Sequence, residues 1–330
     1  MNYNEIRRKS KEIRIGNVII GGNNKIAVQS MTNTDTADSI ATIGQIKALQ
    51  ERGCDIVRIT VPELSAADTI AAIKESGICV PIVADIHFDY KIALKCAELG
   101  VDKIRINPGN IGSDENVKAV CSACKHKNIP IRIGVNSGSL EKSILAKYGA
   151  PTAEALVESA MYHISLLEKY DFDNIVISIK ASDVENMIKA NRLLAERICY
   201  PIHLGVTEAG SFKSGLIKSS IGIGALLNDG IGDTIRVSLT DDPLVEVDSA
   251  KDILNALDVK GQSRLNVVSC PTCGRTRIDL IKLANEVEEA LRGCEKPITV
   301  AVMGCAVNGP GEAREADIGV AGGDKCGLIF

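Results

Sequence analysis

The chain has 330 residues, of which 45% are hydrophobic and 24% are charged, and its formal net charge is -4. A chain of this length is too long to fold around one small hydrophobic core, and it fits a large barrel followed by a second domain. The weak negative charge gives no general attraction to nucleic acid or membranes, and an aromatic content of 3% without tryptophan argues against base stacking.

The N-terminal segment 1–17 is polar and charged, and it lacks the apolar run of a signal peptide. No uninterrupted apolar stretch approaches the roughly 18 residues that a membrane span requires. We therefore expect a cytoplasmic protein with no nucleic-acid or membrane partner. In that compartment the eleven cysteines are more readily thiols and metal ligands than a disulfide scaffold.

Short β-branched runs alternate with longer segments whose apolar residues recur at three- and four-residue steps. Such alternation predicts a parallel sheet, and eight repeats predict a closed (β/α)₈ TIM barrel. An open doubly wound sheet is the rival, but no G-x-G-x-x-G follows the first strand. The predicted strands lie in 25–31, 54–60, 81–87, 102–108, 130–136, 174–180, 201–207 and 233–239.

The pattern changes near Gly261, after a linker around 256–263. We expect a barrel domain in 1–260 and a small α+β domain of the ferredoxin or sulfite-reductase kind in 261–330. Its predicted elements are a strand in 264–270, a helix in 277–293, and strands in 297–304, 316–323 and 327–330.

Polar residues gather where the predicted barrel strands end, which is where the chemistry of such barrels is found. Four arginines and a lysine on separate strands would repel one another without an anion, and guanidinium groups match phosphate oxygens. This set predicts a strongly anionic substrate, most simply a diphosphate. The alternative is that Asp85, Glu208 and Asp241 form salt bridges that only hold loops. The candidate residues are Arg58, Asp85, His87, Arg105, Asn107, Arg132, Asn136, Ser178, Lys180, His203, Glu208, Arg236 and Ser238.

Three of these residues suggest more specific roles. Glu208 is the leading acid or base of the barrel, unless it is the buried partner of one arginine. Asp85 and His87 are two positions apart, so both would point to one face of a strand. They would orient a substrate hydroxyl there or pair with each other.

The motif C-P-T-C places Cys270 and Cys273 at the end of a predicted strand, a spacing found in zinc knuckles and iron–sulfur loops. Cys305 follows a later strand in a Gly-rich loop, where backbone can approach a bulky cluster. Another pair, Cys121 and Cys124, lies within a predicted helix and is not expected to bind metal.

The candidates for the fourth ligand of such a site are Cys294, Cys326 and a carboxylate. Glu312 follows Cys305 after a Gly-Pro-Gly turn and can reach back to the same centre. A carboxylate is displaced more easily than a thiolate. Three cysteines with Glu312 would therefore leave one iron exchangeable, and a substrate oxygen could bind it.

The motifs QSMTNTDT, VRIT, ADIHF, IRINPGN, IRIGVNSGSL, GVTEAG, SCPTCGR and GCAVNGPGE together resemble the 4-hydroxy-3-methylbut-2-enyl diphosphate synthase family, in its two-domain bacterial form. The resemblance implies a [4Fe-4S] cluster held by Cys270, Cys273, Cys305 and Glu312. It also implies that the barrel arginines and Lys180 hold 2-C-methyl-D-erythritol 2,4-cyclodiphosphate, and that Glu208 serves as acid or base.

The same resemblance implies reduced flavodoxin or ferredoxin as electron donor, and a homodimer in which the cluster domain of one chain caps the barrel of the other. Chains of this family continue beyond Phe330 with a strand stretch and a helix. We therefore expect a short natural version or a truncated C-terminus. The alternatives are a barrel lyase or transferase on a phosphorylated small molecule with a structural zinc domain, and a non-enzymatic metal-dependent interaction module.

Overall fold

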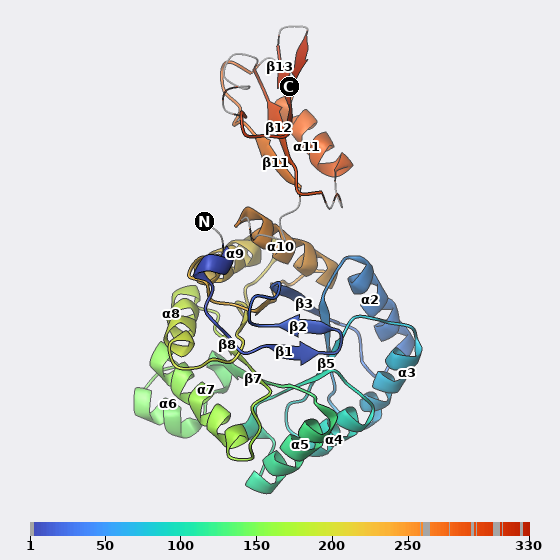
Figure 1. The fold of residues 1–330 in the computed structure, drawn as a ribbon, viewed down its shortest axis with the longest axis vertical. Helices are drawn as coiled ribbons and strands as arrows, with labels where there is room; N and C mark the ends of the chain where they lie inside the picture. The colour runs from blue at the N-terminus through green and yellow to red at the C-terminus, as the bar shows by residue number, and fades with distance from the viewer. Residues whose placement is uncertain are drawn as a thin grey trace. The chain divides into compact units, whose positions relative to one another are not determined.

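The computed structural model describes residues 3–257, 259, 265–276, 278–291, 294, 296–305, 311, 313–323 and 326–330. The chain divides into two units, Met1–Ile253 and Leu254–Phe330, and Figure 1 draws both. Glu312, expected as a cluster ligand, lies outside the described residues. No helix in the described part of the chain is both long and apolar enough to cross a bilayer.

Eight parallel strands form the sheet of the first unit, in the order β8-β7-β6-β5-β4-β3-β10-β9. A parallel bridge between Ile177 and Ile202 brings the two ends of this sheet together, so the barrel is nearly closed. The predicted TIM barrel is therefore confirmed. Its strands are β3 (Ala27–Met31), β4 (Ile56–Thr60), β5 (Ile82–Asp85), β6 (Lys103–Ile106), β7 (Ile131–Asn136), β8 (Ile175–Lys180), β9 (His203–Leu204) and β10 (Thr234–Ile235).

Helices follow the barrel strands and surround them in Figure 1. Several begin where a short polar side chain accepts a hydrogen bond from the first turn, as Asp38, Asp89 and Asp183 do. The helices are α2 (Ser39–Glu51), α3 (Thr69–Glu75), α4 (Tyr90–Glu98), α5 (Asp114–Lys127), α6 (Lys142–Tyr148), α7 (Ala153–Glu168), α8 (Val184–Ala195), α9 (Phe212–Asn228) and α10 (Pro243–Ala256), with 3₁₀ turns η1 (Ser65–Asp68), η2 (Pro108–Asn110) and η3 (Ser137–Ser139).

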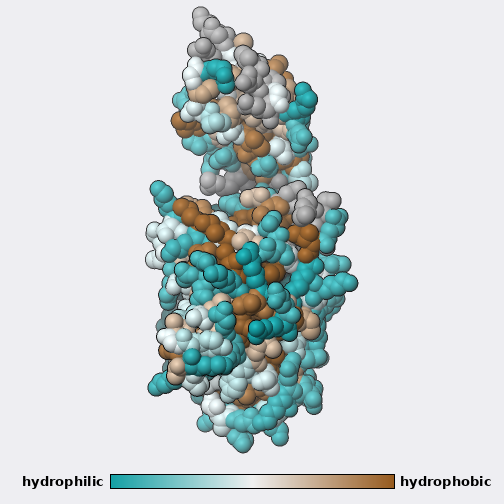
Figure 2. Space-filling model, turned by 90° about the vertical axis from the view of Figure 1, so that its left-hand side faces the viewer, coloured by the Kyte–Doolittle hydropathy of each residue, from teal (hydrophilic) through white to brown (hydrophobic). Residues whose placement is uncertain are grey.

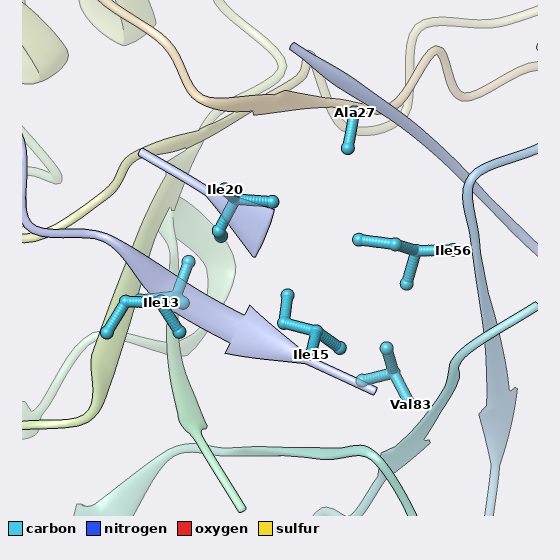
Figure 3. Packing of buried hydrophobic residues seen from close by; sticks show 7 residues of the cluster. Ile13, Ile15, Ile20, Ala27, Ile56 and Val83 are labelled. Atoms are coloured by element: carbon cyan, nitrogen blue, oxygen red, sulfur yellow. The ribbon is translucent and has the colours of Figure 1, made fainter. Parts of the chain in front are cut away.

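An N-terminal hairpin closes one end of the barrel. After α1 (Tyr3–Ile6), strands β1 (Ile13–Ile15) and β2 (Val18–Ile20) pair antiparallel through a two-residue turn, with Gly16 at φ 55°. Three isoleucines of the hairpin pack on residues from the barrel strands, as Figure 3 shows. The cluster comprises Ile13, Ile15, Ile20, Ala27, Ile56, Val83 and Val176. Since Ala27 and Ile56 begin their strands, the hairpin covers the N-terminal end of the barrel and leaves the carboxyl ends for the polar residues.

The second unit contains one four-stranded sheet and one long helix, as predicted. β11 (Asn266–Ser269), β12 (Thr299–Met303) and β13 (Ile318–Gly322) run parallel, and β14 (Gly327–Ile329) is antiparallel to β13. α11 (Leu280–Ala290) begins at Asp279, whose side chain accepts a hydrogen bond from Lys282 N. A small apolar core holds the sheet, and it consists of Ala301, Met303, Ala313 and Ala321.

Candidate active site

The barrel interior is apolar next to the N-terminal hairpin and polar toward the carboxyl ends of the strands. Side chains alternate along each strand, so every second residue points inward. Lys103 Nζ on β6 donates to Gln29 Oε1 on β3 at 3.4 Å. These strands are not neighbours in the sheet, so the contact crosses the barrel interior. Both residues are fully buried, at 0% and 1% exposure.

Asp85 is the centre of a charge cluster at the end of β5. Arg105 Nη1 donates to its Oδ1 at 2.9 Å, and Arg58 Nε lies 3.6 Å from its Oδ2. Burial acts to raise the pKa of Asp85, but Arg58, Arg105 and Arg132 outweigh it and lower the pKa to about 2. Asp85 is therefore a carboxylate at neutral pH.

Gly134 makes room for the Arg105 guanidinium. A Cβ at this position would lie 2.5 Å from Arg105 Nε and 2.8 Å from Nη2. The close approach of the guanidinium therefore requires a residue without a side chain beside Arg105. The glycine lets Arg105 extend along β7 and reach Asp85.

Arg132 has fewer partners than any other arginine of the cluster. It is 1% exposed, and its Nε and Nη1 have no hydrogen-bond partner among the described residues. Arg105 faces it on the neighbouring strand as its Cα partner. Burial, together with Arg58 and Arg105, holds the pKa of Arg132 well below its usual range. The charge of Asp85 acts on this guanidinium, but among the described residues no carboxylate forms a salt bridge with it, so its buried donors stay unsatisfied.

Arg236 follows β10 and pairs with Glu246 in the first turn of α10. The two side chains approach to 3.2 Å, and Glu246 also accepts hydrogen bonds from Ser30 Oγ and Leu239 N, each at 3.0 Å. Lys180, at the end of β8, is buried. Its burial, with Arg236 and Arg58 close by, holds its pKa well below the usual range.

The remaining barrel candidates are placed as follows. Asn107 is buried and its Oδ1 accepts a hydrogen bond from Gly109 N at 3.1 Å. His203 is fully buried, with Nδ1 2.7 Å from Thr234 Oγ1 and no hydrogen-bond partner for Nε2 among the described residues. Burial, then Arg132 and Lys180, holds the pKa of His203 well below its usual range, so the ring is neutral. Ser178 is buried, and Asn136 and Ser238 are half-buried.

Glu208 and His87 are exposed, in the loops after β9 and β5. The alternative reading of Glu208 as the buried partner of an arginine is therefore wrong. Its φ of 52° is in the left-handed region, which a glutamate rarely occupies, and such strain is typical of functional loops. His87 lies two residues beyond the end of β5, so the alternation expected to align it with Asp85 does not apply.

Several buried polar residues around this site are absent from the candidates read off the sequence, among them Gln29, Lys103 and Glu246. Lys103 could have been found, because it alternates with Arg105 on one strand. Glu246 could not, because its pairing with Arg236 depends on how α10 packs. Arg58 and Arg105 pair with Asp85, and Arg236 pairs with Glu246. Among the described residues, Glu208 and Asp241 form no salt bridge with them.

In the second unit, Cys270 and Cys305 follow two paired parallel strands, β11 and β12. Both residues therefore lie at the same edge of the sheet, and Cys273 follows in the loop after Cys270. Gly304 N donates to Cys270 Sγ at 3.2 Å. A Cβ at Gly304 would lie 3.0 Å from the Thr276 side chain, so the two loops pack closely.

All eleven cysteines are free thiols, which excludes a disulfide at this edge. Cys121 and Cys124 are buried in α5, as expected for cysteines that fill a core. Within the described residues, which omit Glu312, no group of three or more His, Cys, Asp and Glu side chains is close enough to hold a metal ion. The thiol donor set and the N–H donated to Cys270 nevertheless suit a thiolate-bound iron–sulfur centre.

Both units match models of known protein families. The GcpE TIM-barrel domain matches residues 10–251, and the GcpE protein C-terminal domain matches residues 266–330. A relative from Clostridium perfringens (strain 13 / Type A) is 59% identical over 98% of this chain and 92% of its own length. Another, from Caldanaerobacter subterraneus subsp. tengcongensis, is 60% identical over 99% of this chain and 91% of its own. Both are called 4-hydroxy-3-methylbut-2-en-1-yl diphosphate synthase (flavodoxin).

Solved structures of other barrels share the fold at low sequence identity. Dihydropteroate synthase from Yersinia pestis has a TM-score of 0.52 and 10% identity, covering 73% of this chain and 96% of that protein. Phospho-2-dehydro-3-deoxyheptonate aldolase from Thermotoga maritima has a TM-score of 0.51 and 15% identity, covering 76% of this chain and 72% of that protein. These two likenesses show the barrel fold alone.

Proposed function

The chain belongs to the GcpE family, and on that premise we propose that it reduces 2-C-methyl-D-erythritol 2,4-cyclodiphosphate to 4-hydroxy-3-methylbut-2-enyl diphosphate, a step of isoprenoid biosynthesis. The family models cover both units, and the two relatives carry a diphosphate synthase name with flavodoxin. Two electrons and two protons enter the reaction. The carbon–oxygen bond that closes the cyclic diphosphate breaks, a carbon–carbon double bond forms, and one hydroxyl leaves as water.

The unpaired guanidinium of Arg132 is the observation that carries the assignment of the substrate site. Nε and Nη1 are buried without acceptors in the described residues, and burying such donors unpaired costs free energy. A diphosphate supplies several acceptor oxygens and negative charge. Arg58, Arg105, Lys180 and Arg236 lie in the same interior, so we assign them to the diphosphate as well.

Neutral residues of the same mouth would bind the rest of the substrate. Asn107, Asn136, Ser178 and Ser238 offer hydrogen bonds to hydroxyls and phosphate oxygens. His203 is neutral and buried, so its Nε2 can take part in a hydrogen bond without adding charge. Asp85 and His87 would hold a substrate hydroxyl, with Asp85 fixed in place by Arg105.

Glu208 would exchange a proton with the leaving hydroxyl. Its loop follows β9, at the carboxyl end where barrel enzymes carry catalytic groups. Its left-handed backbone conformation is consistent with a loop shaped for function at a cost in stability. As a carboxyl group it can accept a proton or donate one as the hydroxyl departs.

Cys270, Cys273, Cys305 and Glu312 would hold a [4Fe-4S] cluster, which supplies electrons to the substrate when it is bound. Thiolates suit iron–sulfur clusters, and the N–H of Gly304 that points at Cys270 Sγ would tune the bound sulfur. Glu312 would be the displaceable ligand. Reduced flavodoxin, named for both relatives, is the first choice of donor, with ferredoxin as the second. We place the reaction in the cytoplasm, where thiols stay reduced.

A homodimer would combine the cluster unit of one chain with the barrel of the other. Figure 2 shows hydrophobic surface gathered on the side of the barrel where α8 and α9 lie in Figure 1. On α9, Ile217 and Ile221 are one turn apart and 53% and 56% exposed. Exposed apolar stripes of this kind are typical of protein interfaces, which supports self-association.

An anaerobic preparation tests this function. We expect brown protein with about four irons per chain and matching sulfide. The spectrum should change when the cyclodiphosphate is added, and reduced flavodoxin should support turnover. Colourless protein with one tightly held zinc would instead support a barrel lyase or transferase with a structural zinc domain, and would refute the proposal.

A further inference from the structure

A buried histidine outside the barrel interior connects two loops of the barrel mouth. His163, on α7, is 0% exposed, and its Nε2 is in contact with Glu141 Oε1. Glu141 stands just before α6, in the loop that begins after Asn136 at the end of β7. Burial acts to raise the pKa of Glu141, but His163, a backbone N–H and Ser159 together outweigh it and lower the pKa to about 2. Glu141 is therefore a carboxylate that His163 can hold.

The other side of the same ring lies against the loop after β6. A Cβ at Gly109 would be 2.7 Å from His163 Cε1 and 3.6 Å from its Nδ1, so the backbone of η2 rests directly on the imidazole. Gly109 N in turn donates to Asn107 Oδ1 at 3.1 Å. The conformation of the Asn107 side chain therefore depends on a backbone group that the histidine supports.

We propose that His163 is a positioning residue, which fixes Asn107 and Asn136 at the barrel mouth by bridging Glu141 and Gly109. Asn107 is connected through Gly109, and Asn136 through the short segment 137–141. His163 contacts neither asparagine in the described structure, so it acts through the two loops. Because Asn107 and Asn136 bind substrate only under the proposed function, this role of His163 in binding rests on that proposal.

The chemistry of imidazole suits both contacts. Nε2 contacts the Glu141 carboxylate, although like Nδ1 it has no partner in hydrogen-bond geometry among the described residues, and Nδ1 faces Gly109. A proton on Nε2 can be donated to the carboxylate, whereas a proton on Nδ1 would be a buried N–H without a partner. Phenylalanine could fill the space but could not donate to Glu141. Glutamine could donate but would not fill the space under Gly109 in the same way.

Three variants of the full-length chain separate these contributions. His163→Phe removes the donor and keeps the ring, Glu141→Leu removes the acceptor, and His163→Gln restores a donor. Glu158→Gln is the matched control. Glu158 also connects α7 to α6, through Lys147 and through Tyr148 Oη at 2.7 Å, and among the described residues it forms no hydrogen bond or salt bridge with either loop.

Binding of the cyclodiphosphate is measured by calorimetry on the apo-protein, so that the cluster and the electron donor play no part. We expect Kd to rise about tenfold in His163→Phe and Glu141→Leu, which corresponds to about 1.4 kcal/mol. His163→Gln should lie between these variants and the wild type, and Glu158→Gln should match the wild type. Amide hydrogen exchange should become faster in 107–112 and 137–141 and stay unchanged in the other barrel loops.

Unchanged Kd and unchanged exchange in His163→Phe and Glu141→Leu would overturn the role of His163. A uniform rise in exchange across the barrel would also overturn it, because it would indicate general loss of stability. If the wild-type protein does not bind the cyclodiphosphate, the proposed function fails instead. The exchange data then still show whether His163 orders the two loops.

Discussion

Replacing Arg132 by methionine is expected to stabilise the ligand-free chain and to abolish diphosphate binding. Arg132 is 1% exposed, and its Nε and Nη1 find no hydrogen-bond partner in the described residues. It also faces Arg105 across β6 and β7 as a Cα partner. Methionine has a similar length, fills irregular space, and removes both the unpaired donors and the repulsion.

The size of the gain follows from the two unpaired donors. Each buried donor without a partner costs about 1–3 kcal/mol. Water that enters the interior of the ligand-free barrel recovers part of this cost. A net increase of about 2 kcal/mol in the free energy of unfolding is therefore expected for Arg132→Met. Under the proposed function this gain is expected, because Arg132 would serve an anion that is absent during the measurement.

Urea denaturation with and without inorganic pyrophosphate provides the assay. Pyrophosphate at a hundred times its Kd should stabilise the wild-type chain by about 2.7 kcal/mol. It should leave Arg132→Met unchanged. Ligand-free Arg132→Met should have the higher midpoint of denaturation.

Arg105→Met is the matched control for this experiment. Arg105 donates to Asp85 at 2.9 Å, so its removal leaves that carboxylate with one partner fewer. Breaking a buried pair in this way is strongly destabilising. Two neighbouring arginines should thus have opposite effects on stability. If Arg132→Met destabilises the ligand-free chain as Arg105→Met does, Arg132 is a structural residue and the reasoning is wrong.

Three further changes test other parts of the site. The pKa of Asp85 is lowered from 3.8 to about 2, so Asp85→Asn should cost about 2 kcal/mol at pH 7. Because this pKa is depressed on folding, the contribution is complete above about pH 4 and is lost as the pH falls through 2. The difference in the free energy of unfolding between the two proteins should fall from about 2 kcal/mol at pH 7 to about 0.8 kcal/mol at pH 2.5. A constant difference would refute the ion-pair explanation. Glu208→Gly removes the left-handed strain and should raise the free energy of unfolding by about 0.5–1 kcal/mol. Turnover should fall at least ~100-fold, because the carboxyl group is lost. A stable variant with full turnover would exclude Glu208 as acid or base. Glu312→Ala should lower turnover far more than it lowers iron content or stability, and unaltered turnover would disprove a displaceable carboxylate ligand.

Much of the barrel was readable from local sequence patterns. Each of the eight strands lies within a predicted run of β-branched and other apolar residues, and each run stands before a helix. Both patterns depend on neighbours within a few positions, so they survive without knowledge of the fold. The same holds for the small unit, whose four strands and long helix follow the predicted runs.

The N-terminal hairpin illustrates what local patterns miss. β1 and β2 have three residues each, which is too short for a recognisable period. They form strands because Ile13, Ile15 and Ile20 bury themselves against the barrel. Their contribution is therefore tertiary, since the apolar surface they cover exists only once the barrel has closed.

Local sequence patterns already indicate which residue types stand at the strand ends: arginines, a lysine and asparagines at the mouth of the barrel, and cysteines after the strands of a second sheet. Which residues pair with one another depends on the tertiary structure. Asp85 with Arg105, Glu246 with Arg236, and His163 with Glu141 join residues on different elements. The unpaired state of Arg132 follows from the same cause. A charge pair depends on distance and burial, and both are set by how strands and helices close around the interior.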